Sequence, residues 1–111
     1  MCGIAGIWGQ ADVSLVKNMM SLVRHRGPDA EGMFVSQNGP GVLGHRRLSI
    51  MDPEGGDQPI YNEAKTMAVI ANGEIYNFPH LRAELAKQHK LYTTSDSEAI
   101  VHLYEDYGVS M

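Results

Sequence analysis

The stretch "CGIAGIWG", residues 2–9, constrains the fold of this chain more than any other. It combines apolar side chains with three glycines. A short apolar run of this kind predicts a buried β-strand. Glycines inside a strand mark places where another part of the molecule approaches the backbone closely. We therefore expect an N-terminal strand against which other elements pack tightly.

The following segments predict a helix and then a β-hairpin. Apolar residues recur at helical spacing over residues 11–27, where Asp12 suits the N-cap position and Gly27-Pro28 ends the pattern. Strands are predicted over residues 33–36 and 41–48, on either side of the turn sequence "QNGPG".

The next part of the chain predicts a loop, a strand pair and a second helix. Residues 51–59, "MDPEGGDQP", have the composition of a loop. Residues 66–77 predict a strand, a turn and a short second strand. A helix is expected over residues 78–90, with Asn77 as its N-cap and Pro79 in its first turn.

A third helix is predicted over residues 95–108. Ser95 and Glu98 have the spacing of a capping box, Asp96 would be the first helical residue, and Gly108 ends the pattern. Strands therefore cluster early and two helices come late, without strict β-α alternation. This order predicts an α+β fold rather than a doubly wound sheet.

Length and charge limit the function classes. A chain of 111 residues corresponds to one domain or part of one. Its net charge of −4 argues against nucleic acid or an anionic membrane surface as the main partner. No apolar run is long enough for a membrane span, and a single cysteine cannot form an internal disulfide. We also expect no leader sequence. We expect a cytoplasmic protein.

Cys2, the one cysteine, could be a nucleophile. A cysteine near an N-terminus is often a small core residue. If the initiator methionine is removed, however, Cys2 carries a thiol and a free α-amine. The amine titrates near ~7.7–8.0 and can accept the thiol proton, so one residue would supply both nucleophile and base.

Arg46 and Arg47 are adjacent on a predicted strand and should point to opposite faces. We expect one to face solvent and the other to be able to reach a pocket, where its guanidinium could bind a carboxylate bidentately. The alternative is that both belong to a solvated charged face. "RHRGPD" predicts a loop that covers the N-terminus or contacts a substrate.

Asn72 and Gly73 offer two neighbouring donors, the side-chain amide and a backbone N–H, which together could form an oxyanion hole. Asn-Gly is also a common turn sequence. The Asp96 carboxylate could stabilise the helix dipole or face a substrate ammonium group. The five histidines show no metal-ligand spacing, and we expect no metal.

Five motifs follow one another along the chain: "MCGIAG", "RHRGPD", "GHRRLSI", "NGEIYN" and "TSDSE". In this order and spacing they resemble the glutaminase domain of class II glutamine amidotransferases, specifically that of glutamine-hydrolysing asparagine synthetases. The resemblance implies an N-terminal nucleophile hydrolase fold, an αββα sandwich. It further implies that residues 1–111 form the N-terminal portion of that domain, without its C-terminal part and without the synthetase domain.

The resemblance also implies roles for individual residues. Cys2 attacks the side-chain amide of glutamine, releasing ammonia and forming a glutamyl thioester, and Asn72 and Gly73 form the oxyanion hole. The implied glutamine-binding residues are Arg47, Leu48, Ser49, Ile50, Met51, Asn72, Gly73, Glu74 and Asp96.

The implied partners are L-glutamine and a synthetase domain or chain that accepts ammonia. No cofactor is implied for this domain, since ATP and Mg²⁺ belong to the synthetase part. The oligomeric state stays open, including a homo-oligomer. The alternative function is a non-catalytic glutamine-binding or interaction module, or a fragment that requires a complementary chain.

Overall fold

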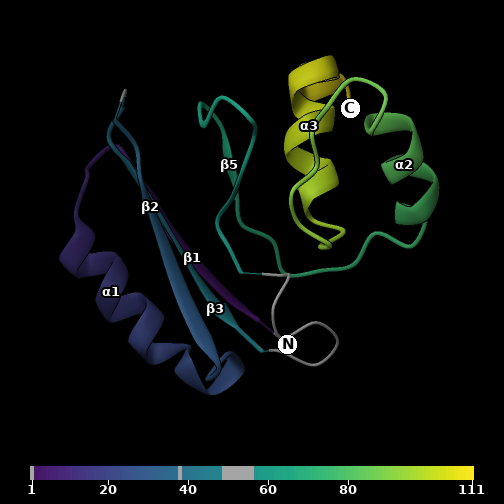
Figure 1. The fold of residues 1–111 in the computed structure, drawn as a ribbon. Coiled ribbons are helices and arrows are strands. Elements are labelled where there is room, and N and C mark those ends of the chain that lie inside the picture. Colours follow the sequence, from purple (N-terminus) through teal and green to yellow (C-terminus); the bar gives the residue numbers. More distant parts are fainter. Residues whose placement is uncertain (1, 38, 49–56) are drawn as a thin grey trace.

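The computed structural model describes residues 2–37, 39–48 and 57–111. Most of the loop predicted at residues 51–59, and Asn38 of the predicted hairpin turn, lie outside the described residues. Figure 1 shows a layered arrangement, in which helix α1 lies on one side, two sheets follow, and helices α3 and α2 lie on the other side.

The N-terminal half forms a three-stranded antiparallel sheet with the strand order β1-β3-β2. Strands β1 (Gly3–Trp8), β2 (Ala30–Val35) and β3 (Gly41–Arg47) confirm the predicted N-terminal strand and hairpin, although β2 begins three residues earlier than expected. Strand β3 lies in the centre and pairs with both neighbours.

Helix α1 (Val13–Leu22) covers one face of this sheet (Figure 1). The Asp12 carboxylate accepts a hydrogen bond of 2.9 Å from the Leu15 amide, which confirms the predicted N-cap. Val16 and Met20 of the helix are buried with Val42 of β3. Burial of these apolar side chains holds the helix on the sheet.

The C-terminal half contains a second, two-stranded sheet and two helices. Strand β4 (Ile60–Tyr61) pairs antiparallel with β5 (Ala68–Val69). Helix α3 (Glu98–Tyr107) packs against both strands and against α2 (Phe78–Leu85), and ends in the short 3₁₀ helix η2 (Gly108–Ser110). The ring of Phe34 in β2 meets Tyr61 in β4 edge-on, with centroids 6.1 Å apart, so the two sheets are in contact.

Three predictions for this half are wrong in detail. Strand β4 was missed, and among the described residues 66–77 only β5 is a strand. The second helix ends at Leu85 instead of continuing to residue 90. The backbone amide of Lys90 is bound by the Glu63 carboxylate at 3.1 Å, so this segment is held against another part of the chain rather than in a helix.

The predicted capping box is also wrong. Helix α3 begins at Glu98, and Asp96 lies in the turn before it. The Glu98 carboxylate does not bind the Ser95 backbone amide, as a capping box requires. It accepts hydrogen bonds from the amides of Tyr92, at 2.9 Å, and Thr93, at 2.8 Å. The carboxylate therefore organises the chain that precedes the helix rather than the first turn.

The mixed α and β composition agrees with the predicted class. None of the described helices has the length and apolar character that crossing a bilayer would require. The cytoplasmic location stays a prediction.

Gly27 is expected to be intolerant of a side chain. It follows the 3₁₀ helix η1 (Arg24–Arg26), and an added Cβ would overlap the Arg46 carbonyl and lie 2.6 Å from the Arg47 nitrogen. Because both atoms are backbone, Gly27→Ala should lower the free energy of unfolding by about 1–3 kcal/mol. Urea denaturation measures this loss.

Gly73→Ala provides the matched control, because nothing lies within 4 Å of its Cβ position. Its effect should stay within about 0.5 kcal/mol. Equal losses in the two variants would contradict the close packing at Gly27.

Candidate functional site

A cleft of about 770 Å³ lies between the end of β3 and the segments that lead into α2 and α3. This volume suits a small-molecule ligand. Seven of the ten predicted site residues line it: Cys2, Arg47, Leu48, Asn72, Gly73, Glu74 and Asp96. The other three, Ser49, Ile50 and Met51, lie outside the described residues. Their roles, like those of the seven, stay predictions.

Cys2 is half-buried at the start of β1 and beside the end of β3. Its Sγ lies 3.5 Å from the Leu48 backbone nitrogen, which donates to the sulfur. The Cys2 carbonyl accepts a hydrogen bond of 3.3 Å from Nε of Arg26. This contact agrees with the structural alternative for "RHRGPD", in which the loop holds the N-terminal segment in place.

Arg46 and Arg47 point in different directions, as predicted, but neither is exposed to solvent. Their side chains are 9% and 8% exposed. The expectation of one solvent-facing arginine is wrong because the segment around Gly27 and the Glu31 side chain contact Arg46. Arg46 donates to the Gly27 carbonyl at 2.9 Å and to Glu31 at 2.6 Å, away from the cleft.

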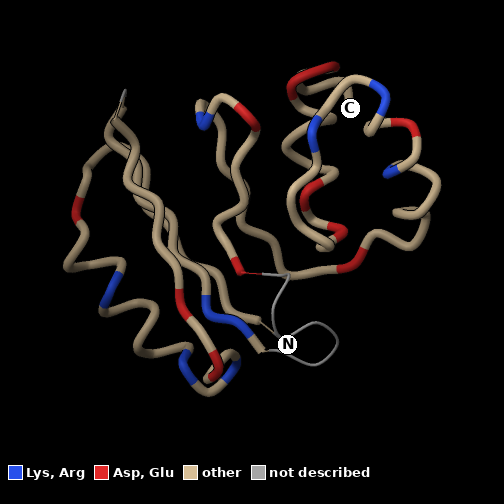
Figure 2. Tube along the Cα trace, viewed as in Figure 1, with Lys and Arg blue, Asp and Glu red and all other residues tan. Residues whose placement is uncertain are grey.

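Arg47 lines the cleft and donates to the Asp57 carboxylate at 2.9 Å. Figure 2 shows these basic residues at the end of β3 near the N-terminus, while acidic residues lie on the segments that lead toward α2 and α3. Glu74 and Asp96 belong to that acidic side. The cleft thus has one basic and one acidic wall, which suits a ligand with charges of both signs.

The segment from Asn72 to Glu74 is held at both ends. Before it, the Ala71 amide donates to Oε1 of Gln58 at 2.7 Å. After it, the Ile75 amide donates to Oδ2 of Asp96 at 2.6 Å. These two bonds fix the backbone on either side of Asn72 and Gly73, so the carboxylate of Asp96 acts on the shape of the cleft as well as on its charge.

His45 is a cleft residue that the sequence-based prediction missed. It lies two positions before Arg47 on β3 and therefore shares its face, which is the signal that could have identified it. Its ring is buried, and Nε2 lies 3.2 Å from the Ala71 carbonyl, to which it donates. Burial lowers the pKa of His45 below its ordinary value, and the charge of Arg47 lowers it further, against the opposing effect of the Ala71 hydrogen bond.

Comparison with known proteins decides the family. A family model described as a glutamine amidotransferase domain matches residues 1–111. The chain belongs to this family. It is 51% identical to asparagine synthetase [glutamine-hydrolyzing] 1 of Arabidopsis thaliana, over 98% of this chain and 19% of that protein.

Two other asparagine synthetases match nearly the whole chain in the same way. The chain is 51% identical to asparagine synthetase [glutamine-hydrolyzing] 2 of rice, Oryza sativa subsp. japonica, over 97% of this chain and 19% of that protein. The nodule asparagine synthetase of pea, Pisum sativum, is 45% identical over the same shares. The chain thus spans about a fifth of the length of these relatives, and their match confirms the predicted family resemblance.

His45 should make stability depend on pH. Because its folded-state pKa is lowered, the unfolded chain binds more protons than the folded chain just below pH ~6.5, and stability falls as the pH drops through this window. Urea denaturation of the native chain from pH 7.5 down to 5 should show this loss, and His45→Gln should reduce it. The comparison cancels contributions from the other histidines, and parallel pH curves would contradict the assignment.

Proposed function

We propose that this chain is a glutaminase, in which Cys2 hydrolyses the side-chain amide of L-glutamine bound in the cleft. The observation that carries the proposal is the convergence of a thiol, a guanidinium, the Asn72-Gly73 pair and two carboxylates on one cleft. These groups come from four separate parts of the chain. The match to the glutamine amidotransferase family supports the same reaction class.

In the proposed reaction, removal of the initiator methionine frees the α-amine of Cys2. The amine accepts the thiol proton, and the thiolate attacks the amide carbon of glutamine. The negative charge that develops on the amide oxygen is stabilised by the Asn72 side chain and the Gly73 N–H. The amine then returns the proton to the leaving nitrogen, ammonia departs, and water hydrolyses the resulting thioester to glutamate.

Substrate binding would use both walls of the cleft. The guanidinium of Arg47 would pair with the α-carboxylate, and Glu74 and Asp96 would hold the α-ammonium and amide ends. Backbone groups from residue 48 to residue 51 would complete the pocket. Since an analogue that lacks one charge would lose its contact with one wall of the cleft, such analogues should bind poorly.

The relatives are named asparagine synthetases, and we propose that the ammonia is used by such a synthetase part. ATP, Mg²⁺ and aspartate would belong to that part, with no cofactor needed in these residues. The proposed fold is a portion of the αββα sandwich, which the order of helix and sheet layers supports (Figure 1).

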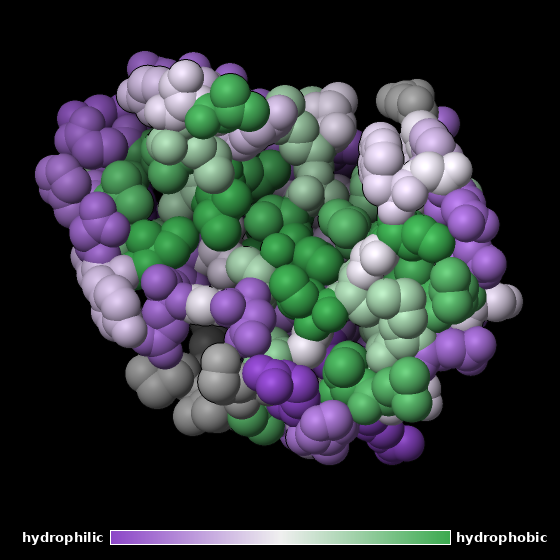
Figure 3. Space-filling view, turned by 180° about the vertical axis from the view of Figure 1, so that it is seen from behind, coloured by the Kyte–Doolittle hydropathy of each residue, from purple (hydrophilic) through white to green (hydrophobic). Residues whose placement is uncertain are grey.

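Apolar surface left uncovered supports a partial sandwich as well. Figure 3 shows a broad band of hydrophobic residues across the middle of the molecule seen from behind. On β1, Ile4 is 50% exposed although α1 covers the opposite face of the sheet. Further strands of the same domain would cover such a surface.

Covalent labelling tests the proposal directly. A diazo-ketone analogue of glutamine should add once to the native chain, at Cys2, and intact mass should also show the loss of methionine. Cys2→Ala should remove the adduct, and excess glutamine should slow labelling. A chain that keeps its methionine, or that labels no faster than free cysteine, would instead favour the non-catalytic glutamine-binding module.

The oxyanion hole predicts a second kinetic effect. Asn72→Ala should lower kcat for glutamine hydrolysis by about 10²–10³-fold with little change in KM, because the lost hydrogen bond forms fully only in the transition state. Asn77→Ala is the matched control, since Asn77 precedes α2 without a side-chain capping bond and does not line the cleft. A loss of similar size in both variants would contradict the role of Asn72.

A further inference from the structure

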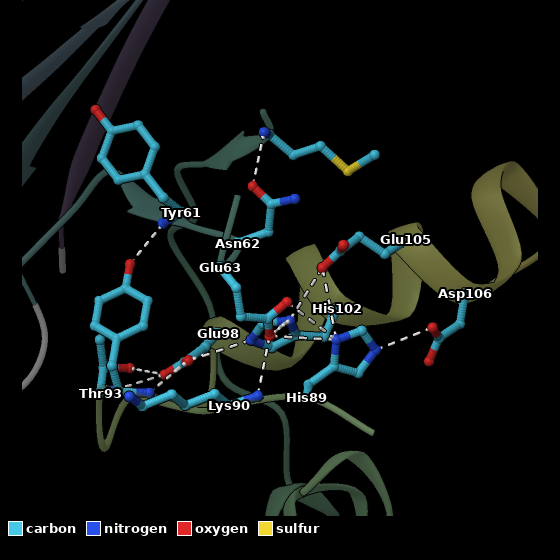
Figure 4. A network of polar contacts seen from close by, with 12 residues as sticks. Tyr61, Asn62, Glu63, His89, Lys90, Thr93, Glu98, His102, Glu105 and Asp106 are labelled. Atoms are coloured by element: carbon cyan, nitrogen blue, oxygen red, sulfur yellow. Dashed lines mark hydrogen bonds and ion pairs between the residues drawn. The ribbon is translucent and has the colours of Figure 1, made fainter. Parts of the chain in front are cut away.

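A second group of ionisable side chains lies away from the cleft, between α3 and the β4–β5 sheet (Figure 4). We call Glu63, His89, His102 and Glu105 the His–Glu cluster. They come from the chain after β4, the chain after α2, and α3. One ligand atom of each lies within 4.8 Å of every other, so four potential metal ligands face a common point.

The two imidazole rings are oriented in the same way. Nε2 of His89 lies 2.9 Å from the Asp106 carboxylate, and Nε2 of His102 lies 3.2 Å from the Glu98 carboxylate. A carboxylate partner on one ring nitrogen can hold the proton there and leave the other nitrogen as a metal ligand. In both rings that other nitrogen, Nδ1, is the one directed at the cluster. Each Nδ1 also lies within hydrogen-bond distance of a cluster carboxylate, 3.3 Å between His102 and Glu105 and 3.5 Å between His89 and Glu63, and a bound ion would replace these contacts.

The separations between the histidine and glutamate ligand atoms of the cluster are close to those of a tetrahedral zinc site. Nδ1 of His102 lies 3.3 Å from oxygens of both Glu63 and Glu105. Nδ1 of His89 lies 3.3 Å from Glu63 and 3.7 Å from Glu105. Four ligands about 2.0–2.1 Å from a zinc ion stand roughly 3.3–3.4 Å apart. The four His-to-Glu separations lie at or near this value, and all other separations lie within 4.8 Å, so the side chains would have to draw together by up to about 1.4 Å to bind one ion.

The surroundings hold these side chains in place. His102 is fully buried, and the side chain of His89 is only 8% exposed. Oε1 of Glu63 accepts the Lys90 amide at 3.1 Å. Glu98 is fully buried, and its carboxylate accepts the amides of Tyr92 and Thr93 as well as contacting His102.

Charge also favours a cation. Four carboxylates, those of Glu63, Glu98, Glu105 and Asp106, contact the two imidazoles. With neutral rings the group carries a formal charge of about −4, although only Glu98 is fully buried and the other three carboxylates are partly exposed. Like charges this close repel one another unless a cation lies between them. One divalent cation supplies the same positive charge as protonating both rings, while also accepting the lone pairs of both Nδ1 atoms.

We propose that the His–Glu cluster binds one divalent transition-metal ion of the zinc type through His89, His102, Glu63 and Glu105. Imidazole ligands favour such an ion over Mg²⁺ or Ca²⁺. Four protein ligands leave no open position, which is typical of a structural rather than a catalytic site. The ion would tie α3 to the segments after β4 and α2. The sequence-based expectation of no metal did not anticipate this convergence, because the ligands are spread over more than forty residues.

Zinc titration of the intact, chelator-treated chain tests the proposal, with bound metal counted by native mass spectrometry. We expect one Zn²⁺ per chain and a higher Tm in its presence. Asp106→Asn, which removes only the carboxylate behind His89, should weaken binding about 10–100-fold. His102→Gln should weaken it further, and circular dichroism of each variant checks that the fold is retained.

His80→Gln is the matched control, because His80 is an exposed histidine on α2 outside the cluster. It should bind zinc as the native chain does. The proposal is overturned if the native chain takes up no stoichiometric zinc, or if Asp106→Asn and His80→Gln bind zinc with the same affinity. Because the readouts are metal binding and Tm, a failure here leaves the glutaminase proposal unaffected.

Discussion

The antiparallel pairing of β1 with β3 is the interaction on which the cleft depends. In this register Gly3 lies opposite Arg46, so the residue before the strand, Cys2, meets the end of β3. The Leu48 amide then contacts the sulfur, and Arg47 lines the same cleft. A shift by one residue would turn every side chain of β3 to the other face, which would remove Arg47 from the cleft and bring Arg46 into it. The apolar core under α1 specifies the register, and the core and the cleft are therefore built by the same strand pairing.

The opposite wall of the cleft depends on polar anchors rather than on a regular sheet. Strand β5 ends at Val69, and the backbone that follows is held by Gln58, His45 and Asp96. Backbone groups that do not take part in a strand still need partners when they are shielded from water. Side chains supply them here, and this arrangement leaves Asn72 and Gly73 free of the hydrogen-bond ladder. Irregular backbone of this kind can direct its amides toward a ligand, which a paired strand cannot.

Local patterns in the sequence predicted those parts of the fold that depend on neighbouring residues. The strand before α1 follows from its apolar run, the helix start from the Asp12 cap, and the hairpin of β2 and β3 from its turn sequence. The errors arise where distant parts of the chain meet. Glu98 has the spacing of a capping box, but the amides of the preceding segment bind it instead. Residues 2, 47, 72, 74 and 96 could be assigned to one site only through a family resemblance, because their spacing in the sequence does not show that they meet. The structure places all five beside one cleft.

Helix α3 connects the cleft with the His–Glu cluster through a short chain of contacts. His102 in the cluster bonds to Glu98, and Glu98 binds the amides of Tyr92 and Thr93. That segment continues directly into the turn that carries Asp96, whose carboxylate holds the Ile75 amide at the edge of the cleft. A contact or ion that orders the His–Glu cluster would therefore also limit the movement of Asp96 in the acidic wall of the cleft. No residue of the cluster itself lines the cleft. If the cleft binds glutamine as proposed, a bound ion at the cluster would act on that binding through the preorganisation of Asp96, which lowers the entropy cost of binding without adding a contact to the ligand.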